Sequence, residues 1–235
     1  MALRIKAALA AALSFAAINV NAQAPAAPPP VPADVSPLYV VTYVEARPNA
    51  RDEAAALLKS YREASRKTAG NLRSVVVQRV RRPGQFVVVA AWRNKAAWDA
   101  AAAGSKSFRE KLNALRNSPA DDRFHNSLSV GPMDVPIMAG AVYAVIHVDV
   151  IPPQRENAVV ALKVLGEANR GAAGNLRYEI VQQTNRPNHF TVLEMWRSRE
   201  AFDSNSMGAH QREFRDKLAQ MTGALYDERL YEILD

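Results

Sequence analysis

Hydrophobic and polar residues alternate between residues 142 and 151 of this 235-residue chain. Tyr143, His147 and Asp149 fall on one face of the alternation, and small or branched apolar residues form the other face. A period of two predicts a β-strand with buried residues on at least one face. Pro152 and Pro153 end the strand, and because proline is favoured in the first turn of a helix, we expect a helix to follow.

The rest of this region predicts a compact α+β unit. One apolar stripe in the expected helix consists of Ala158, Leu162, Leu165 and Ala168. After Gly174 we expect strands at 175–184 and 189–196, joined as a hairpin by a turn of Asn, Arg and Pro. Ser198 can cap a second helix, and 227–234 supplies a fourth strand. The order β-α-β-β-α-β is that of a ferredoxin-like, or split βαβ, unit.

The same unit occurs earlier in the chain, displaced by 104 residues. Gly-Asn-Leu-Arg stands at 70–73 and again at 174–177, and the same offset aligns Pro83 with Pro187 and Trp92 with Trp196. Farther on the offset becomes 106, so the second copy has two extra residues before its last helix. This repeat predicts two tandem domains, at 38–135 and 140–235.

Each predicted unit has helices on one face of its sheet only, which leaves the other face uncovered. We therefore expect the two copies to pack sheet to sheet as an intramolecular dimeric α+β barrel. A further homo-oligomer stays an open alternative. A functional site is expected either between a sheet and its helices or between the two sheets.

The N-terminal residues 1–22 have the features of a secretory signal peptide. Arg4 and Lys6 precede an apolar run, and small residues near Ala22 suit cleavage by signal peptidase. Residues 23–37 are rich in Pro and Ala, which predicts an extended linker. No stretch reaches the roughly 20 apolar residues of a transmembrane helix. We expect a periplasmic or secreted protein without membrane contact after cleavage.

Composition limits the kinds of site and partner that the chain can have. The chain has no cysteine, which excludes disulfides, a thiolate nucleophile and cysteine-ligated metals. The net charge of +7 includes Arg4 and Lys6, and the remaining arginines are scattered. We therefore expect no nucleic-acid partner. The chain also has neither a Gly-rich dinucleotide fingerprint nor a dense cluster of His and carboxylates, so we expect no cofactor and no metal.

One group of motifs resembles the antibiotic biosynthesis monooxygenase domain of the dimeric α+β barrel superfamily. These are the Arg-x-x-x-Gly-Asn turn at 170–175, Phe190-x-x-x-Glu194-x-Trp196 and the following Ala201-Phe202. The resemblance covers nearly all of 38–235, twice. It implies cofactor-independent oxygenation, in which a quinol-like or polyketide-like aromatic loses a proton and its anion passes an electron to O₂.

Candidate site residues are taken mainly from copy two, where the copies differ. Trp196 shares a strand face with Phe190 and Glu194, which we assign to the open side of the sheet. Trp196 can stack on a planar substrate, or it can simply fill the core. Glu194, aligned with Ala90, is a candidate base with a raised pKa, an ion-pair partner of Arg177, or a solvated rim residue.

His147 is a second candidate base or substrate partner, with a purely structural role as the alternative. Asn205 stands where many members of the resembled family have a histidine, and it can hydrogen-bond a substrate oxygen or lie exposed on its helix. We expect catalytic roles for Trp196, Glu194, His147 and Asn205, and substrate contacts for Tyr143, Phe190, Tyr178 and Trp92. Copy one, with its alanine run at 100–103, looks chemically poorer and is expected to cover copy two.

Three functions remain compatible with the sequence. The first is an exported cofactor-independent monooxygenase that oxidises a small aromatic with O₂. The second is a non-catalytic protein that binds a small hydrophobic molecule. The third is a structural module whose two faces are packed solid.

Overall fold

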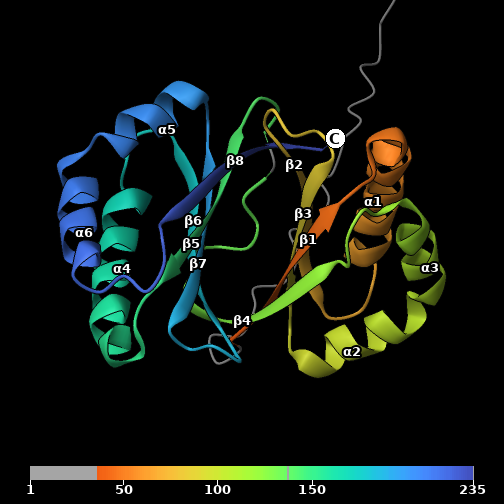
Figure 1. Cartoon of the computed structure of the whole chain (residues 1–235), viewed down its shortest axis with the longest axis horizontal. Coiled ribbons are helices and arrows are strands. Elements are labelled where there is room, and N and C mark those ends of the chain that lie inside the picture. Colours follow the sequence, from red (N-terminus) through yellow and green to blue (C-terminus); the bar gives the residue numbers. More distant parts are fainter. Residues whose placement is uncertain (1–35, 137, 235) are drawn as a thin grey trace, which may run out of the picture. The chain divides into compact units, whose positions relative to one another are not determined.

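The computed structural model describes residues 36–136 and 138–234, so the predicted signal peptide and nearly all of the linker lie outside the described residues. Copy one contains two helices between β3 and β4 (Figure 1). Its elements are β1 (Leu38–Glu45), η1 (Pro48–Ala50), α1 (Arg51–Arg66), β2 (Asn71–Arg79), β3 (Gln85–Trp92), α2 (Lys95–Gly104), α3 (Lys106–Leu115) and β4 (Asp121–Ser129).

Copy two repeats this order. Its elements are β5 (Val142–Asp149), η2 (Pro152–Gln154), α4 (Arg155–Arg170), β6 (Asn175–Gln183), β7 (His189–Trp196), α5 (Arg199–Ser206), α6 (Ala209–Ala219) and β8 (Asp227–Ile233). Asn94 and Ser198 each accept a hydrogen bond from the backbone three residues on, and so cap α2 and α5. The cap at Ser198 was predicted. No helix of the described residues is long and apolar enough to cross a membrane.

The eight strands form one closed barrel in the order β1-β3-β2-β8-β5-β7-β6-β4. Within each copy the sheet is antiparallel, and the copies join where β2 pairs with β8 and β4 with β6. The helices of each copy cover the outer face of their own sheet (Figure 1). The fold is therefore two tandem ferredoxin-like units closed into an intramolecular α+β barrel, as the sequence predicts.

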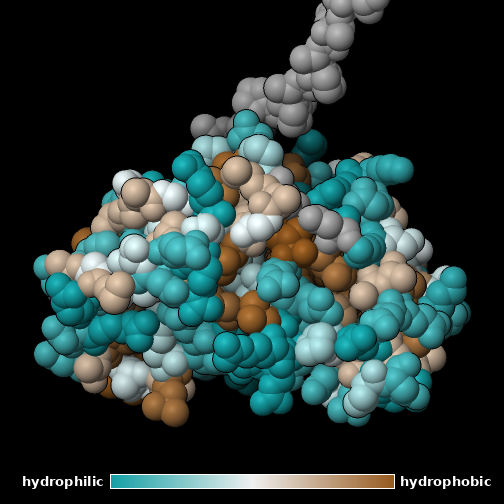
Figure 2. Space-filling model, turned by 90° about the horizontal axis from the view of Figure 1, so that it is seen from above, coloured by the Kyte–Doolittle hydropathy of each residue, from teal (hydrophilic) through white to brown (hydrophobic). Residues whose placement is uncertain are grey.

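Apolar side chains occupy both faces of every sheet. Tyr143 and Val145 belong to a cluster inside the barrel, whereas Ile146 and Val148 pack under α4 and α6. Side chains at the surface are mostly hydrophilic in the view of Figure 2, with apolar groups gathered near its middle. Because both faces of each sheet are covered, a buried site can lie on either side of it.

Two local expectations were wrong. The second helix of each copy is broken in two, because Ser105 and Gly208 leave the helical conformation. The predicted apolar stripe fails at its last position, where Ala168 is exposed and the polar Asn169 is buried instead. That buried amide bears on the site described below.

The repeated Gly-Asn-Leu-Arg motif has a structural role in both copies. Gly70 and Gly174 have φ of +81° and +82°, and a Cβ at either would lie 2.5 or 2.6 Å from an alanine Cβ. Inside the barrel, Arg73 and Arg177 both bind the carboxylate of Glu179, whose side chain is fully buried. The motif therefore supplies a helix-to-strand turn and an ion-pair cluster between the copies.

Candidate functional site

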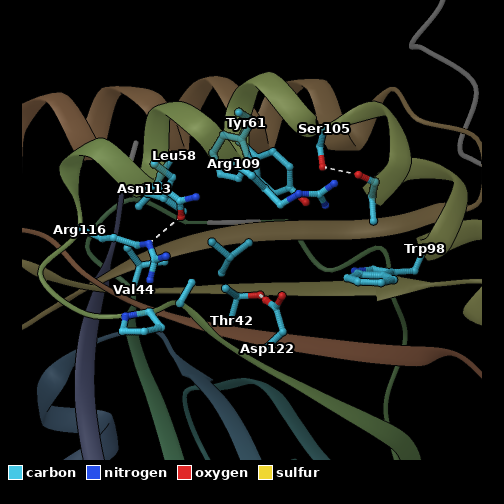
Figure 3. Close-up of a pocket in the computed structure, with 16 residues that line it drawn as sticks. Thr42, Val44, Leu58, Tyr61, Trp98, Ser105, Arg109, Asn113, Arg116 and Asp122 are labelled. Carbon is cyan, nitrogen blue, oxygen red and sulfur yellow. Dashed lines mark hydrogen bonds between the residues drawn. The ribbon is translucent and has the colours of Figure 1, made fainter.

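A cavity of about 240 Å³ lies in copy one, between the sheet and α1, α2 and α3 (Figure 3). Apolar side chains such as Val44, Leu58 and Val88 form part of its wall. The ring of Tyr61 stacks on Phe108 at 4.0 Å, and Trp98 meets Phe124 edge to face at 4.8 Å. The cavity thus offers flat aromatic and apolar walls to a small molecule.

Charged groups line another part of this cavity. Thr42 donates a hydrogen bond of 2.5 Å to the carboxylate of Asp122, and Arg116 donates one of 2.7 Å to Asn113. Arg109 extends from α3 into the space between helix and sheet (Figure 3). Because two guanidinium groups face a single carboxylate, the lining carries excess positive charge and favours a ligand with a partly or fully anionic oxygen.

The sequence of α2 explains why this space is open. Copy one has alanines at 100–103, and α2 buries no residue at all. In copy two, α5 buries Phe202 and Asn205, which align with Trp98 and Ala101. The alanine run, which looks bland in the sequence, therefore leaves room for the cavity.

Trp92 is buried beside this region, at 1% exposure, and its indole Nε1 has no hydrogen-bond partner among the described residues. It packs with Ala90 in a cluster that also includes Trp98, one of the cavity-lining residues. In copy two the aligned Trp196 donates a 2.6 Å hydrogen bond to Glu194. Copy one has Ala90 at the position of Glu194, so the buried indole N–H of Trp92 lacks the acceptor that Trp196 has.

Glu194 is buried between the sheet and the helices of copy two, at 2% exposure. Burial raises its pKa to about 8, against the smaller lowering by the Trp196 hydrogen bond. The carboxyl is therefore mainly protonated near neutral pH. It neither pairs with Arg177, which binds Glu179, nor lies at a solvated rim, so both of those alternatives are wrong.

A polar cluster fills the space between α4, α5 and α6 of copy two. Asn205 donates to the side-chain oxygen of Asn169 at 2.7 Å, and Gln211 donates to the same atom at 3.2 Å. A ring nitrogen of His210 lies 3.1 Å from both asparagine oxygens. Asn205 is therefore committed to packing contacts within the protein rather than exposed on its helix.

His147 and Tyr143 lie inside the barrel, on the opposite face of the sheet from Glu194. His147 Nε2 is 2.9 Å from the hydroxyl of Tyr43, its own counterpart in copy one. Burial is the main cause that lowers the pKa of His147 to about 4. The hydroxyl of Tyr143 is buried and has no partner among the described residues. His147 is thus a neutral group of the interface between the copies.

The sequence pattern of the antibiotic biosynthesis monooxygenase family matches residues 37–110 and 141–217. The chain belongs to this family. Both matched segments contain a sheet, a covering helix and the strand tryptophan, so each copy is a domain of the family in its own right. No curated protein matches the chain.

Solved structures with the same fold match across both copies. A proposed monooxygenase from Lactobacillus acidophilus NCFM is 18% identical, with a TM-score of 0.72 over 85% of this chain and 95% of its own. One from Fusobacterium nucleatum is 12% identical, with a TM-score of 0.78 over 86% and 94%. An anthrone oxidase-like protein is 14% identical, with a TM-score of 0.66 over 87% and 94%.

The predicted site residues of this family member fall into three separate places. The group on the predicted Trp196 face does share one face, but that face lies under the helices and not on the open side of the sheet. It comprises Trp196, Glu194 and Phe190, with Tyr178 and Asn205 nearby in the same layer. His147 and Tyr143 lie inside the barrel, and Trp92 lies in copy one. A single pocket formed by all eight residues is therefore excluded.

Sequence reasoning missed the residues of the copy-one cavity, including Tyr61, Trp98, Arg109 and Asp122. Their residue types do not by themselves indicate a site, and the alanine run at 100–103 on α2 was the only signal of a space. Among the described residues, no group of three or more His, Asp or Glu side chains is arranged to hold a metal ion.

Proposed function

We propose that this chain is a cofactor-independent monooxygenase that oxidises an electron-rich aromatic, quinol-like or polyketide-like, with O₂ in the copy-one cavity. Membership of the family supports this chemistry, and the observation that carries the location is the aromatic cavity with two guanidinium groups. The alternative is a binder without catalysis, which has the same ligand but consumes no O₂.

The lining residues suit the first step, which is formation of the substrate anion. Asp122 is the carboxylate among the lining residues and is the proton acceptor in this proposal. Arg109 and Arg116 stabilise the negative oxygen that results. The unpaired indole N–H of Trp92 is a further donor for a substrate oxygen that reaches past Trp98.

The oxidation then needs only O₂ and the substrate's own electrons. The anion passes one electron to O₂, and the substrate radical and superoxide combine into a peroxide. With a proton returned to it, the peroxide loses water. A polyketide-like CH₂ group plus O₂ then becomes a C=O group plus H₂O, and a quinol plus O₂ becomes a hydroxyquinone plus H₂O. The protein holds the substrate ring between the stacked Tyr61–Phe108 pair and Trp98, and it excludes bulk water from the intermediates.

Oxygen uptake tests the proposal with variants that differ by one position on α2. Ala102 lines the cavity, so Ala102→Phe fills it, whereas Ala103 is exposed and does not line it. With a panel of quinols and anthrones, we expect uptake by the wild type and by Ala103→Phe, and at least a tenfold loss in Ala102→Phe. Equal rates in both variants contradict the location, and binding without uptake supports the non-catalytic alternative.

We also propose export of the chain, on the strength of the N-terminal sequence. Fractionation of cells that express the full chain tests this directly. The expected result is a periplasmic or secreted product that begins after Ala22. A product in the cytoplasm with its N-terminus intact contradicts it.

A further inference from the structure

A groove of about 450 Å³ runs between α1 and the α2–α3 segment of copy one. It is more open than the inner cavity and lies next to it, because Tyr61, Ser105 and Phe108 line both spaces. The stacked rings of Tyr61 and Phe108 therefore stand between an outer groove and an inner cavity. An inner ligand and a group in the groove would both contact these rings.

Small and uncharged side chains dominate the groove. Ala64, Ala101 and Gly104 supply apolar surface, and serines such as Ser60 supply hydroxyl groups. No carboxylate lines the groove, and Lys111 is its charged residue. A surface of this kind suits an uncharged, slender chain more than an ionic group.

Copy two shows what closes the same space. Asn169, Asn205 and Gln211 form the buried hydrogen-bonded cluster described above. Their aligned residues in copy one are Ser65, Ala101 and Ser105, and all three line the groove. Three shorter side chains thus replace the amide cluster, and the groove occupies the position of that cluster.

We propose that the groove and the inner cavity are two compartments of one binding site, which takes an aromatic head inside and an unbranched alkyl arm in the groove. This inference rests on the proposed function, because it adds an arm to the aromatic substrate of the same site. The inner cavity alone is smaller than the roughly 300–1,000 Å³ usual for small-molecule sites, and the two compartments together fall within that range. The substrate is then an alkylated quinol or phenol, and Tyr61 and Phe108 select for a narrow link between its two parts.

Calorimetric titration without O₂ tests the inference with hydroquinone and its 2-butyl and 2-hexyl derivatives. Each methylene buried in the groove contributes about 0.8 kcal/mol, which corresponds to roughly fourfold in affinity. We expect the affinity of the wild type to rise by about this factor for each methylene that the groove accommodates. An affinity that does not change with chain length overturns the inference.

A pair of variants distinguishes binding of the alkyl arm in the groove from hydrophobic binding elsewhere on the protein. Ala101→Asn introduces the residue of copy two into the groove, and Ala103→Asn places the same residue on the exposed side of α2. We expect Ala101→Asn to remove the chain-length dependence, while Ala103→Asn behaves as the wild type.

The outcomes distinguish the two proposals. If chain length has the same effect in Ala101→Asn as in the wild type, the arm does not lie in the groove and the inference fails alone. If neither hydroquinone nor its derivatives bind, and no quinol supports oxygen uptake, the proposed function fails and the inference fails with it.

Discussion

Replacement of Glu194 by glutamine should change how stability depends on pH, because the carboxyl is buried and forms no ion pair with the described residues. Its pKa is about 8 in the folded chain, against the ordinary value of 4.5 that applies when the chain is unfolded. Between these two pH values the folded chain keeps a proton that the unfolded chain has lost. The free energy of unfolding therefore falls as pH rises from 4.5 to 8, and the loss is complete above pH 8.

The size of the effect follows from the width of that pH window. One unit of pKa difference corresponds to about 1.4 kcal/mol, so the window from pH 4.5 to pH 8 corresponds to about 5 kcal/mol. Glu194→Gln keeps the shape of the side chain and an oxygen that can accept the Trp196 hydrogen bond, but it cannot ionise. All other titrating groups are common to both proteins and cancel in the difference.

Urea unfolding of both proteins at pH 5, 6, 7 and 8 measures this difference. We expect the variant to gain about 1.4 kcal/mol relative to the wild type for each pH unit inside the window. Parallel stability curves for the two proteins would refute the assignment of Glu194 as a protonated acid. A steeper fall in the variant than in the wild type would contradict it as well.

Three further predictions concern other buried groups. His147 has a lowered pKa of about 4, so the protein should lose up to about 1.4 kcal/mol per pH unit from this group as pH falls from 6.5 to 4; His147→Gln should remove that part of the slope in urea unfolding. Glu179→Gln removes the carboxylate that binds the two arginines of the repeated motif and should lower the free energy of unfolding by about 3–5 kcal/mol in the same assay. An unchanged urea midpoint would contradict a stabilising role for these ion pairs. Gly174→Ala should cost at least about 1 kcal/mol, because φ is +82° and the new Cβ would meet Ala201, while Gly131→Ala, with open space around it, serves as the control.

The fold could be predicted from the sequence because glycine, proline and tryptophan keep one register through both copies. These residues mark turns and strand ends, and they fix the order of elements even where neighbouring residues differ. The uncovered sheet face then requires a partner, which the second copy provides. The break in each second helix was missed because the residues at the break, Ser105 and Gly208, are not strong signals within a short amphipathic stretch.

The site was harder to predict than the fold. Alternation showed that Glu194 and Trp196 share a face, but it could not show which face the helices cover, because both faces of the strand are apolar. The cavity and the groove arise because copy one has short side chains: alanines on α2, and Ser65 at the groove where copy two has Asn169. Chemically rich residues in copy two fill its helix–sheet space, so residue type pointed to the closed copy.

Binding stoichiometry shows whether copy one alone holds the aromatic ligand. Anaerobic calorimetric titration of a quinol that supports oxygen uptake gives the number of sites per chain for the wild type, Ala102→Phe and Ala103→Phe. We expect one site in the wild type and in Ala103→Phe, and none in Ala102→Phe. Two sites per chain, or one site that survives in Ala102→Phe, would contradict it.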